Sequence, residues 1–373
     1  MLFSSIPGHS LLKERLIEMA NADRVGHALL FWGEEGVGAL ALALALAQQM
    51  VCKNLEGGVA CGKCPSCNKM QKLIHPDLHF AVPVNSVKPS DRNPVTDHYM
   101  AVWKEALLEH PYMLEHQWYN TLGIDSKSGN ISVHEADKIL KKLSFKPFEG
   151  DRKFMIIWLP ERMNLQAANT LLKILEEPPA GTHFFLVSEH PEQLLGTIRS
   201  RCQHIRVNPI AIDELTPVLA QEFSMAPHEA EVLARLSAGS YGKALYAYYR
   251  SDQQERANTF IYTLIDAALG KDLEAVIKWA DEAAALGREQ QRQTLFSLLA
   301  LLRELYMKHL KAHRLVYIPE SELPRLHAWA AKLPTAFFPT LSTALHGALS
   351  DIDRNVPGKM IFYSVALHFF FSS

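Results

Sequence analysis

The sequence has no apolar stretch long enough to cross a bilayer. Its two most apolar segments are residues 39–47 and residues 360–371, and Ser364 and His368 interrupt the second. A membrane-spanning helix needs about 20 apolar residues. The first ten residues also lack the basic start and apolar core of a secretory signal peptide. We therefore expect a soluble, cytoplasmic protein that does not act on a membrane.

Charge of one sign and cysteine are also scarce. The 38 lysines and arginines nearly balance the 40 aspartates and glutamates, which leaves a net charge of −2. No global basic field therefore favours nucleic acid or an anionic membrane, and any contact with DNA has to be local or shared with partners. The five cysteines, in a reducing compartment, favour metal binding or free thiols over disulfides. A chain of 373 residues is too long for one core and predicts two or three domains.

A glycine-rich turn follows the first apolar strand of the chain. It spans residues 33–40 (GEEGVGAL) and opens a helix rich in alanine and leucine. Strand, turn and helix are the setting of a phosphate-binding loop, whose usual pattern is G-x-x-x-x-G-K-[ST]. Gly33 and Gly38 occupy the glycine positions, whereas Ala39 and Leu40 stand where the pattern has lysine and a hydroxyl residue.

These two replacements remove chemistry but not the backbone that would hold a phosphate. Loop N–H groups and a helix N-terminus can still face an anion. The ammonium that reaches the β- and γ-phosphates and the hydroxyl that binds Mg²⁺ are missing. Two interpretations stay open for this octapeptide: a degenerate nucleotide site at Gly33, Gly36 and Gly38 that is empty or weak, or a turn that never bound a nucleotide.

The most specific local pattern is a group of four cysteines. Cys52, Cys61, Cys64 and Cys67 have the spacing C-x8-C-x2-C-x2-C. Two C-x2-C steps direct thiolates toward one centre, and four thiolates complete the tetrahedral shell of a structural zinc ion with no position left for water. We therefore predict one structural zinc per chain. Unrelated thiols, a redox pair or an iron–sulfur cluster are the alternatives.

The acidic motif of a nucleotide hydrolase is missing as well. Residues 153–159 (KFMIIWL) form a continuous apolar run and predict a buried parallel strand. In a nucleotide hydrolase the end of such a strand presents carboxylates to Mg²⁺ and water. Here only Glu161 is acidic, and it lies past the expected position. The loop and this strand have therefore lost function in the same sense.

The order of predicted elements indicates the fold class. Strands and helices alternate between residues 28 and 207, which predicts a parallel α/β sheet covered by helices on both faces. Strands stop after Pro209, and a polar interruption near residue 250 separates two helical parts. We expect a core at 1–208 with a cysteine module at 52–67 and an insertion at 83–130, a small helical domain at 209–250 and an all-helical domain at 251–373.

Three features of the core receive no specific role. Residues 83–130 are rich in proline and polar residues and are interpreted as an insertion with one or two short helices. A basic helix after residue 131 is interpreted as a solvated face rather than a DNA contact, and two histidines as structural or surface residues, because the cysteine set is already complete. The residues concerned are Lys138, Lys141, Lys142 and Lys146 on the helix, and His75 and His79.

Taken together, these pieces resemble the AAA+ subunits of the bacterial replicative clamp loader. The similarity covers residues 1–82 and 131–250 well, and residues 251–373 mainly by helical character. The matching stretches are residues 27–31 (HALLF), the four cysteines directly after the loop helix, residues 168–179 (ANTLLKILEEPP), residues 197–202 (TIRSRC) and residues 355–359 (NVPGK).

The resemblance implies a subunit without its own ATPase activity. Gamma/tau subunits of that family keep the lysine and acidic motifs, whereas delta-prime subunits keep Ser-Arg-Cys but commonly lack a working nucleotide site. This chain fits the second description. By resemblance, Arg201, next to Ser200 in that motif, is an arginine finger for ATP on a neighbouring gamma/tau subunit, since a guanidinium need not come from the chain that binds the nucleotide.

The resemblance also implies an assembly. Residues 1–208 would be a nucleotide-hydrolase-like AAA+ core, residues 209–250 its lid and residues 251–373 the collar that holds a hetero-pentamer together. The partners would be gamma/tau-like ATPases and a delta-like subunit within DNA polymerase III, with the sliding clamp and primer-template DNA as indirect partners. Two departures stand out: Lys243 lies where the family often has a nucleotide-sensing arginine, and residues 83–130 have no counterpart that aligns.

Two other functions remain compatible with the residues. A divergent ATPase could replace the missing groups with Lys63 or Glu161, and would hydrolyse ATP as an isolated chain. A stand-alone zinc-dependent nucleic-acid-binding protein would need tight, salt-dependent binding by the monomer, whereas the near-neutral charge predicts weak binding.

Overall fold

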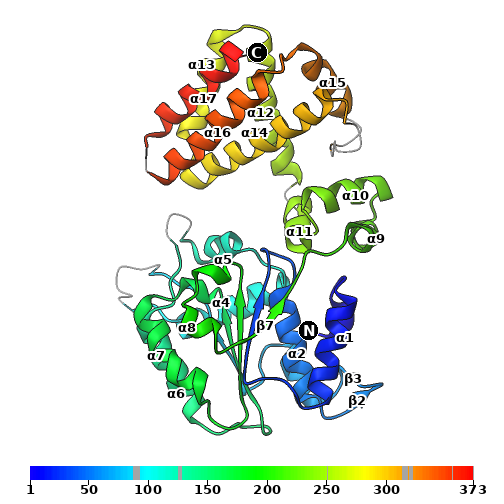
Figure 1. The fold of residues 1–373 in the computed structure, drawn as a ribbon, viewed down its shortest axis with the longest axis vertical. Helices are drawn as coiled ribbons and strands as arrows, with labels where there is room; N and C mark the ends of the chain where they lie inside the picture. Colours follow the sequence, from blue (N-terminus) through cyan, green and yellow to red (C-terminus); the bar gives the residue numbers. More distant parts are fainter. Residues whose placement is uncertain are drawn as a thin grey trace. The chain divides into compact units, whose positions relative to one another are not determined.

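The protein consists of two compact units, Met1–Leu245 and Tyr246–Ser373, each described here by itself. The structure is a computed structural model, and it describes residues 1–86, 93–124, 128–249, 251–312, 318, 322–354 and 356–372 (Figure 1). Arg250 and Asn355, which mark a predicted boundary and a predicted motif, lie outside these residues. The division into three domains stays a prediction.

A parallel five-stranded sheet forms the centre of the first unit, with strand order β4-β5-β6-β1-β7. Every residue of β5 is buried, as its continuous apolar run predicts for a strand covered on both sides. The expected parallel α/β fold is confirmed for the described residues. The strands are β1 (Ala28–Trp32), β4 (Leu78–Ala81), β5 (Lys153–Trp158), β6 (Thr182–Ser188) and β7 (Gln203–Arg206).

Helices cover both faces of this sheet (Figure 1). Successive strand residues point to opposite faces, so Leu29 and Phe31 of β1 join one core cluster and Ala28 and Leu30 join the other. The first face packs against the N-terminal helices, and the second against helices that precede β5, β6 and β7. These helices are α1 (Ser10–Asn21) and α2 (Ala39–Val51) on the first face, and α6 (Val133–Ser144), α7 (Leu165–Glu176) and α8 (Gly196–Arg199) on the second.

Residues 83–130, interpreted from the sequence as an insertion with one or two short helices, contribute two helices that pack into the core. Their described part forms α4 (Thr96–Glu109) and α5 (Glu115–Leu122). Trp103 and Trp118, one from each helix, are fully buried, with ring centroids 5.0 Å apart, and Trp103 also packs 5.2 Å from Trp158 at the end of β5. The buried tryptophans hold these helices against the sheet.

The remaining elements of the first unit are short or lie after the sheet. Three helices follow β7 and contribute Leu215, Leu219 and Ala244 to the same core cluster as β1. They lie in the helical part that the sequence predicts after Pro209. They are α9 (Ile212–Phe223), α10 (Pro227–Leu236) and α11 (Tyr241–Tyr249); the short elements are η1 (Phe3–Ser5), β2 (Leu55–Glu56), β3 (Val59–Ala60), α3 (Pro65–Gln71), η2 (Pro160–Arg162) and η3 (Pro191–Gln193).

The described part of the second unit is helical, as expected. Its core cluster is separate from those of the first unit and is rich in leucine and aromatic residues. Within the described ranges, none of the helices in either unit combines the length and apolar character that a bilayer crossing requires. The helices are α12 (Ser251–Leu269), α13 (Leu273–Ala285), α14 (Arg288–His309), α15 (Leu323–Lys332), α16 (Phe337–Asp353) and α17 (Gly358–Ser372).

Candidate functional site

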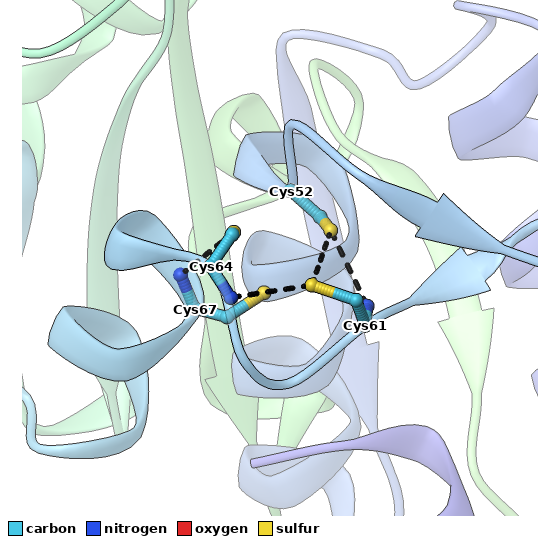
Figure 2. A group of neighbouring side chains, drawn as sticks. All are labelled: Cys52, Cys61, Cys64 and Cys67. Atoms are coloured by element: carbon cyan, nitrogen blue, oxygen red, sulfur yellow. Dashed lines mark hydrogen bonds between the residues drawn. The ribbon is translucent and has the colours of Figure 1, made fainter.

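The four clustered cysteines converge on one point (Figure 2). Cys52 follows α2, Cys61 follows the β2–β3 hairpin, Cys64 is the N-cap of α3 and Cys67 lies in its first turn. The four Sγ atoms lie within 4.8 Å of one another, and those of Cys52 and Cys61 are 3.7 Å apart. Thiolates about 2.3 Å from a tetrahedral zinc would be about 3.8 Å apart. The spacing therefore fits a metal of that size.

Backbone N–H groups point at these sulfur atoms, as metal thiolates require. The N–H of Cys61 donates to Sγ of Cys52 at 3.3 Å, and the N–H of Cys64 donates to Sγ of Cys61 at 3.3 Å. Such donors stabilise negative charge on sulfur and fix its direction. The fifth cysteine, Cys202, lies elsewhere, and burial raises the pKa of its thiol to about 11. The predicted metal-binding group is confirmed as a cluster, and Cys202 is not part of it.

The glycine-rich turn has the backbone of a phosphate loop. Gly36 and Gly38 have φ angles of +74° and +102°, which favour glycine. Gly38 is the N-cap of α2, so the helix begins at the position expected from the sequence. The cavity beside the loop, however, has a volume of about 20 Å³. That is room for about one water molecule.

The cavity is small because two distant segments cover the loop. A Cβ atom on Gly38 would lie 3.1 Å from the ring of Tyr112, and one on Gly36 would lie 2.7 Å from Oγ of Ser240. The Ser240 hydroxyl donates to the carbonyl of Glu35 at 2.7 Å. From the first turn of α11, the N–H of Gly242 donates to the carbonyl of Gly36 at 2.9 Å. The loop's own polar groups are therefore partly engaged within the chain.

The Tyr112 ring is itself held in place. Its centroid is 4.7 Å from that of Tyr241, in an edge-to-face arrangement. Next to it, the N–H of Glu115 donates to the Glu35 carboxylate at 2.9 Å, and Arg162 pairs with the Glu115 carboxylate at 2.6 and 2.7 Å. Segment 111–115 is thus fastened to the loop on one side and to η2 on the other.

The surroundings of the loop are acidic, which is the opposite of a phosphate site. Burial raises the pKa of Glu189 well above its ordinary value, and the nearby carboxylates of Glu35, Glu161 and Glu115 raise it further, against a smaller opposing effect of Lys243. One Glu161 oxygen accepts the N–H groups of Glu189 at 2.8 Å and His190 at 3.1 Å. Glu161 therefore has a structural role, because it binds the backbone that follows β6. The carboxylates of Glu35 and Glu161 would repel a triphosphate.

Arg201 lies on the surface, between α8 and β7. Its Nε donates to the Glu176 carboxylate at 2.7 Å and its Nη1 to the carbonyl of Thr197 at 2.6 Å, and its Nη2 also contacts Glu176. The exposed hydroxyl of Ser200 donates to the same Thr197 carbonyl at 3.2 Å. Arg199 instead reaches the carbonyl of Pro191 at 3.3 Å. The guanidinium of Arg201 is thus oriented by the C-terminal end of α7.

Comparison with known proteins shows the family. A sequence model described as "DNA polymerase III, delta subunit" matches residues 8–211. The DNA polymerase III subunit delta' of Escherichia coli K12 is 30% identical over 341 residues, which cover 91% of this chain and 85% of that protein. The chain belongs to the delta-prime family of DNA polymerase III.

The chain is also similar to other proteins of DNA polymerase III. Subunit delta' of Bacillus subtilis is 31% identical over 216 residues, which cover 58% of this chain and 52% of that protein. Subunit tau of Salmonella typhimurium is 24% identical over 83% of this chain and 44% of its own length. Among solved structures, a gamma-subunit-related protein of Thermotoga maritima aligns over 97% of this chain and 99% of its own, with 16% identity and a TM-score of 0.42.

The delta-prime assignment confirms the family resemblance, while the roles of single residues stay predictions. The structure brings the four cysteines together, builds the glycine loop as expected, and presents Arg201 at the surface. It places Lys63 in the cysteine module, where its ammonium lies 3.6 Å from Glu56, and not among the residues that line the loop cavity. The sequence-based analysis did not predict that Tyr112 and Glu115 cover the loop. The signal available in the sequence was the pair of tryptophans, Trp103 and Trp118, because two such large apolar side chains favour a packed segment.

Proposed function

We propose that this chain is a non-hydrolysing delta-prime-type subunit of a bacterial DNA polymerase III clamp loader, which supplies Arg201 to ATP bound by a neighbouring gamma/tau-type subunit. The observation that carries the proposal is the contrast between the two sites. The cavity beside the chain's own phosphate loop has a volume of about 20 Å³. Arg201, in contrast, lies at the surface, where its guanidinium can reach a nucleotide bound by another chain.

The covered loop supports the absence of ATP hydrolysis by this chain. A triphosphate needs donors and cations, but here Tyr112 fills the space, Ala39 replaces the lysine, and the carboxylates of Glu35 and Glu161 lie nearby. In this proposal Glu161 does not replace the missing carboxylate, because one of its oxygens accepts the backbone N–H groups of residues 189 and 190. In this proposal ATP is not bound productively, and the core serves as a rigid wall of the assembly.

Arg201 is the group best suited to act in trans. Transfer of a phosphoryl group places charge on several oxygens in one plane, and a planar guanidinium with several donors matches them. The exposed ion pair between Arg201 and Glu176 contributes at most about 1 kcal/mol, so phosphate oxygens can replace the carboxylate. Ser200 supports the turn that carries Arg201.

The cysteine cluster would hold one structural zinc ion. Four sulfur ligands from Cys52, Cys61, Cys64 and Cys67 leave no position open for water. When bound, zinc would act as a cross-link that joins the end of α2, the β2–β3 hairpin and α3. A side chain of the protein makes a second connection: Gln49 accepts the N–H of Ala60 at 2.7 Å and so joins the hairpin to α2.

The assembly follows from the family. Residues 1–208, 209–250 and 251–373 would act as an AAA+ core, a lid and a collar. The partners would be gamma/tau-like ATPases and a delta-like subunit in a cytoplasmic hetero-pentamer, and ATP hydrolysis in the partners would drive loading of the sliding clamp onto primed DNA.

Reconstitution tests this proposal. The chain is combined with gamma/tau-type and delta-type subunits, and steady-state ATP hydrolysis is compared for the wild type, Arg201→Ala and the control Arg24→Ala, which changes another exposed arginine. An arginine finger is worth about 10³-fold or more in turnover. Arg201→Ala should therefore abolish the share of hydrolysis that comes from the neighbouring site, with the assembly intact by size-exclusion chromatography.

Two results would contradict the proposal. One is full ATPase activity of an intact assembly that contains Arg201→Ala. The other is ATP turnover by the isolated wild-type chain that disappears in Glu161→Gln, because that result would make the chain a divergent ATPase.

A further inference from the structure

A basic groove lies at the edge of the sheet where β4 and β5 begin. It has a volume of about 620 Å³. One wall is the lysine-bearing side of α6, and the other is the loop of residues 145–149 that leads into β5. Its charged and aromatic lining residues are Lys138, Lys141, Lys142, Lys146, Lys153, Asp77, His79, Asp97, Phe145 and Phe148.

Both carboxylates of the groove are already engaged. Asp97 pairs with Lys142 at 2.5 Å. The two oxygens of Asp77, a buried residue, accept the N–H groups of Phe148 at 2.6 Å and Glu149 at 2.8 Å. The groove therefore carries an excess of positive charge that its own acidic residues do not neutralise.

Three lysines of the groove are available to a ligand. The side chains of Lys138, Lys141 and Lys146 are exposed, and none forms an ion pair with any residue that the structure describes. The positive field reaches their neighbours as well. Burial, and then the charges of Lys142 and Lys153, lower the pKa of His79 to about 4, and burial with the charge of Lys142 lowers the pKa of Lys104.

Two phenylalanines are displayed beside these lysines. Phe145 is 65% exposed and Phe148 is 82% exposed. Neither ring fills a core. The loop that carries them is fixed by hydrogen bonds to the buried side chains of Asp77 and Lys153. Buried Lys153 donates to the carbonyls of Leu143, at 3.0 Å, and Phe145. Together with the Asp77 bonds, this buried ammonium fixes the backbone of the loop from which the two rings project.

We propose that this groove binds single-stranded DNA. Lysines that follow a backbone, next to aromatic faces on which bases stack, are the usual means of binding a single strand without sequence preference. Phosphates would contact Lys138, Lys141 and Lys146, and unpaired bases would stack on Phe145 and Phe148. A duplex would satisfy the lysines but would keep its bases away from the rings. The site goes beyond the function proposed above, which requires no DNA contact by this chain.

Fluorescence anisotropy with the full chain tests the proposal. The probe is a labelled oligomer of about 12 deoxythymidines, within the usual site size of such grooves. We expect a Kd on the order of 10⁻⁵ M at low salt, and a slope of about −2 for log K against log salt, because each of three phosphate contacts contributes about −0.7.

Variants of the lysines and of the phenylalanines test whether the oligomer binds in the groove or on another surface. Lys138→Gln/Lys141→Gln should weaken binding and make the salt slope shallower. Phe148→Ala should weaken binding about fivefold or more, and Phe148→Trp should restore it, since each stacked base contributes measurably. The matched controls are Lys278→Gln and Phe371→Ala, which change an exposed lysine and an exposed phenylalanine outside the groove. Circular dichroism checks that each variant is folded.

Three outcomes would overturn the proposal. Binding that is equal in the wild type and in both groove variants would place the oligomer elsewhere. Equal affinity for a duplex of the same length would exclude stacking on the rings. No oligomer binding, together with binding of a polyglutamate peptide that the groove variants abolish, would make the groove a docking surface for an acidic protein.

Discussion

At the scale of single residues, the arginine proposed to act in trans is already paired within its own chain. Arg201 contacts both Glu176 and the carbonyl of Thr197. Because the ion pair is partly exposed, solvent screens it. The pair therefore orients the guanidinium but binds it only weakly. Glu176 lies at the end of α7 in the same motif (LEEPP) that carries the family resemblance. The motif thus orients the arginine of the Ser-Arg-Cys turn, which follows it in the chain.

His79 on β4 is one residue through which we expect acid to weaken the first unit. Its pKa is lowered to about 4, mainly by burial, from about 6.5 in an unfolded chain. Between these values the unfolded chain binds a proton that the folded chain does not. The stability that His79 contributes is therefore fully present above pH 6.5 and is lost as the pH falls toward 4. His79→Gln should lose less in melting temperature between pH 7 and pH 5 than the wild type.

Thermal melting followed by circular dichroism at the two pH values measures this difference. His134→Gln changes an exposed histidine of α6 and should follow the wild type. Acid release of a bound metal would affect all three proteins equally, so it does not alter the comparison. Parallel losses in His79→Gln and the wild type would mean that His79 does not carry the effect.

At the scale of elements, the phosphate loop should stay closed even when its missing residues are restored. Ala39→Lys/Leu40→Thr rebuilds the motif, but Tyr112 and the start of α11 still cover the loop. We expect no binding of Mg·ATP at millimolar concentration by isothermal titration calorimetry. Adding Tyr112→Ala should open the cavity and give measurable binding, at a cost in stability of about 3–5 kcal/mol. Tight binding by the double variant would show that the cover does not exclude nucleotide.

The cysteine module offers a second test at this scale. Metal analysis of the purified chain should find about one zinc per molecule, and Cys64→Ser should find almost none and melt at a lower temperature. Cys202→Ser is the matched control, because it removes a buried cysteine outside the cluster and should keep its zinc. Retention of zinc by Cys64→Ser, or iron in place of zinc, would contradict the assignment.

These two elements also show what a sequence can predict. The four cysteines lie within one short segment, so their spacing alone predicts the cluster. The strand, turn and helix of the glycine loop are local too, and were predicted for the same reason. The cover over the loop depends on Tyr112 and Ser240, which reach it through the packing of α4, α5 and α11, and no local pattern expresses that packing. The polar and proline-rich character of residues 83–130 hid two buried tryptophans that fix this arrangement.

At the scale of the whole molecule, each unit has a core of its own. Among the described residues, the two clusters on the faces of the sheet consist of residues of the first unit, and the cluster that contains Trp279, Phe337 and Phe362 consists of residues of the second. A chain of about 250 residues buries roughly 70% or more of its unfolded surface, which is enough for independent folding. The cysteine module, the covered loop and Arg201 all belong to the first unit.

A fragment of residues 1–249, which ends with α11, should therefore fold alone. We expect it to melt in one cooperative transition and to keep its zinc, since all four cysteines of the cluster belong to the first unit. If residues 251–373 form the collar, the fragment should fail to co-purify with gamma/tau-type subunits that capture the full chain. A folded fragment that joins the assembly as well as the full chain does would place the subunit contacts in the first unit. An insoluble fragment without zinc would show that the first core depends on the second.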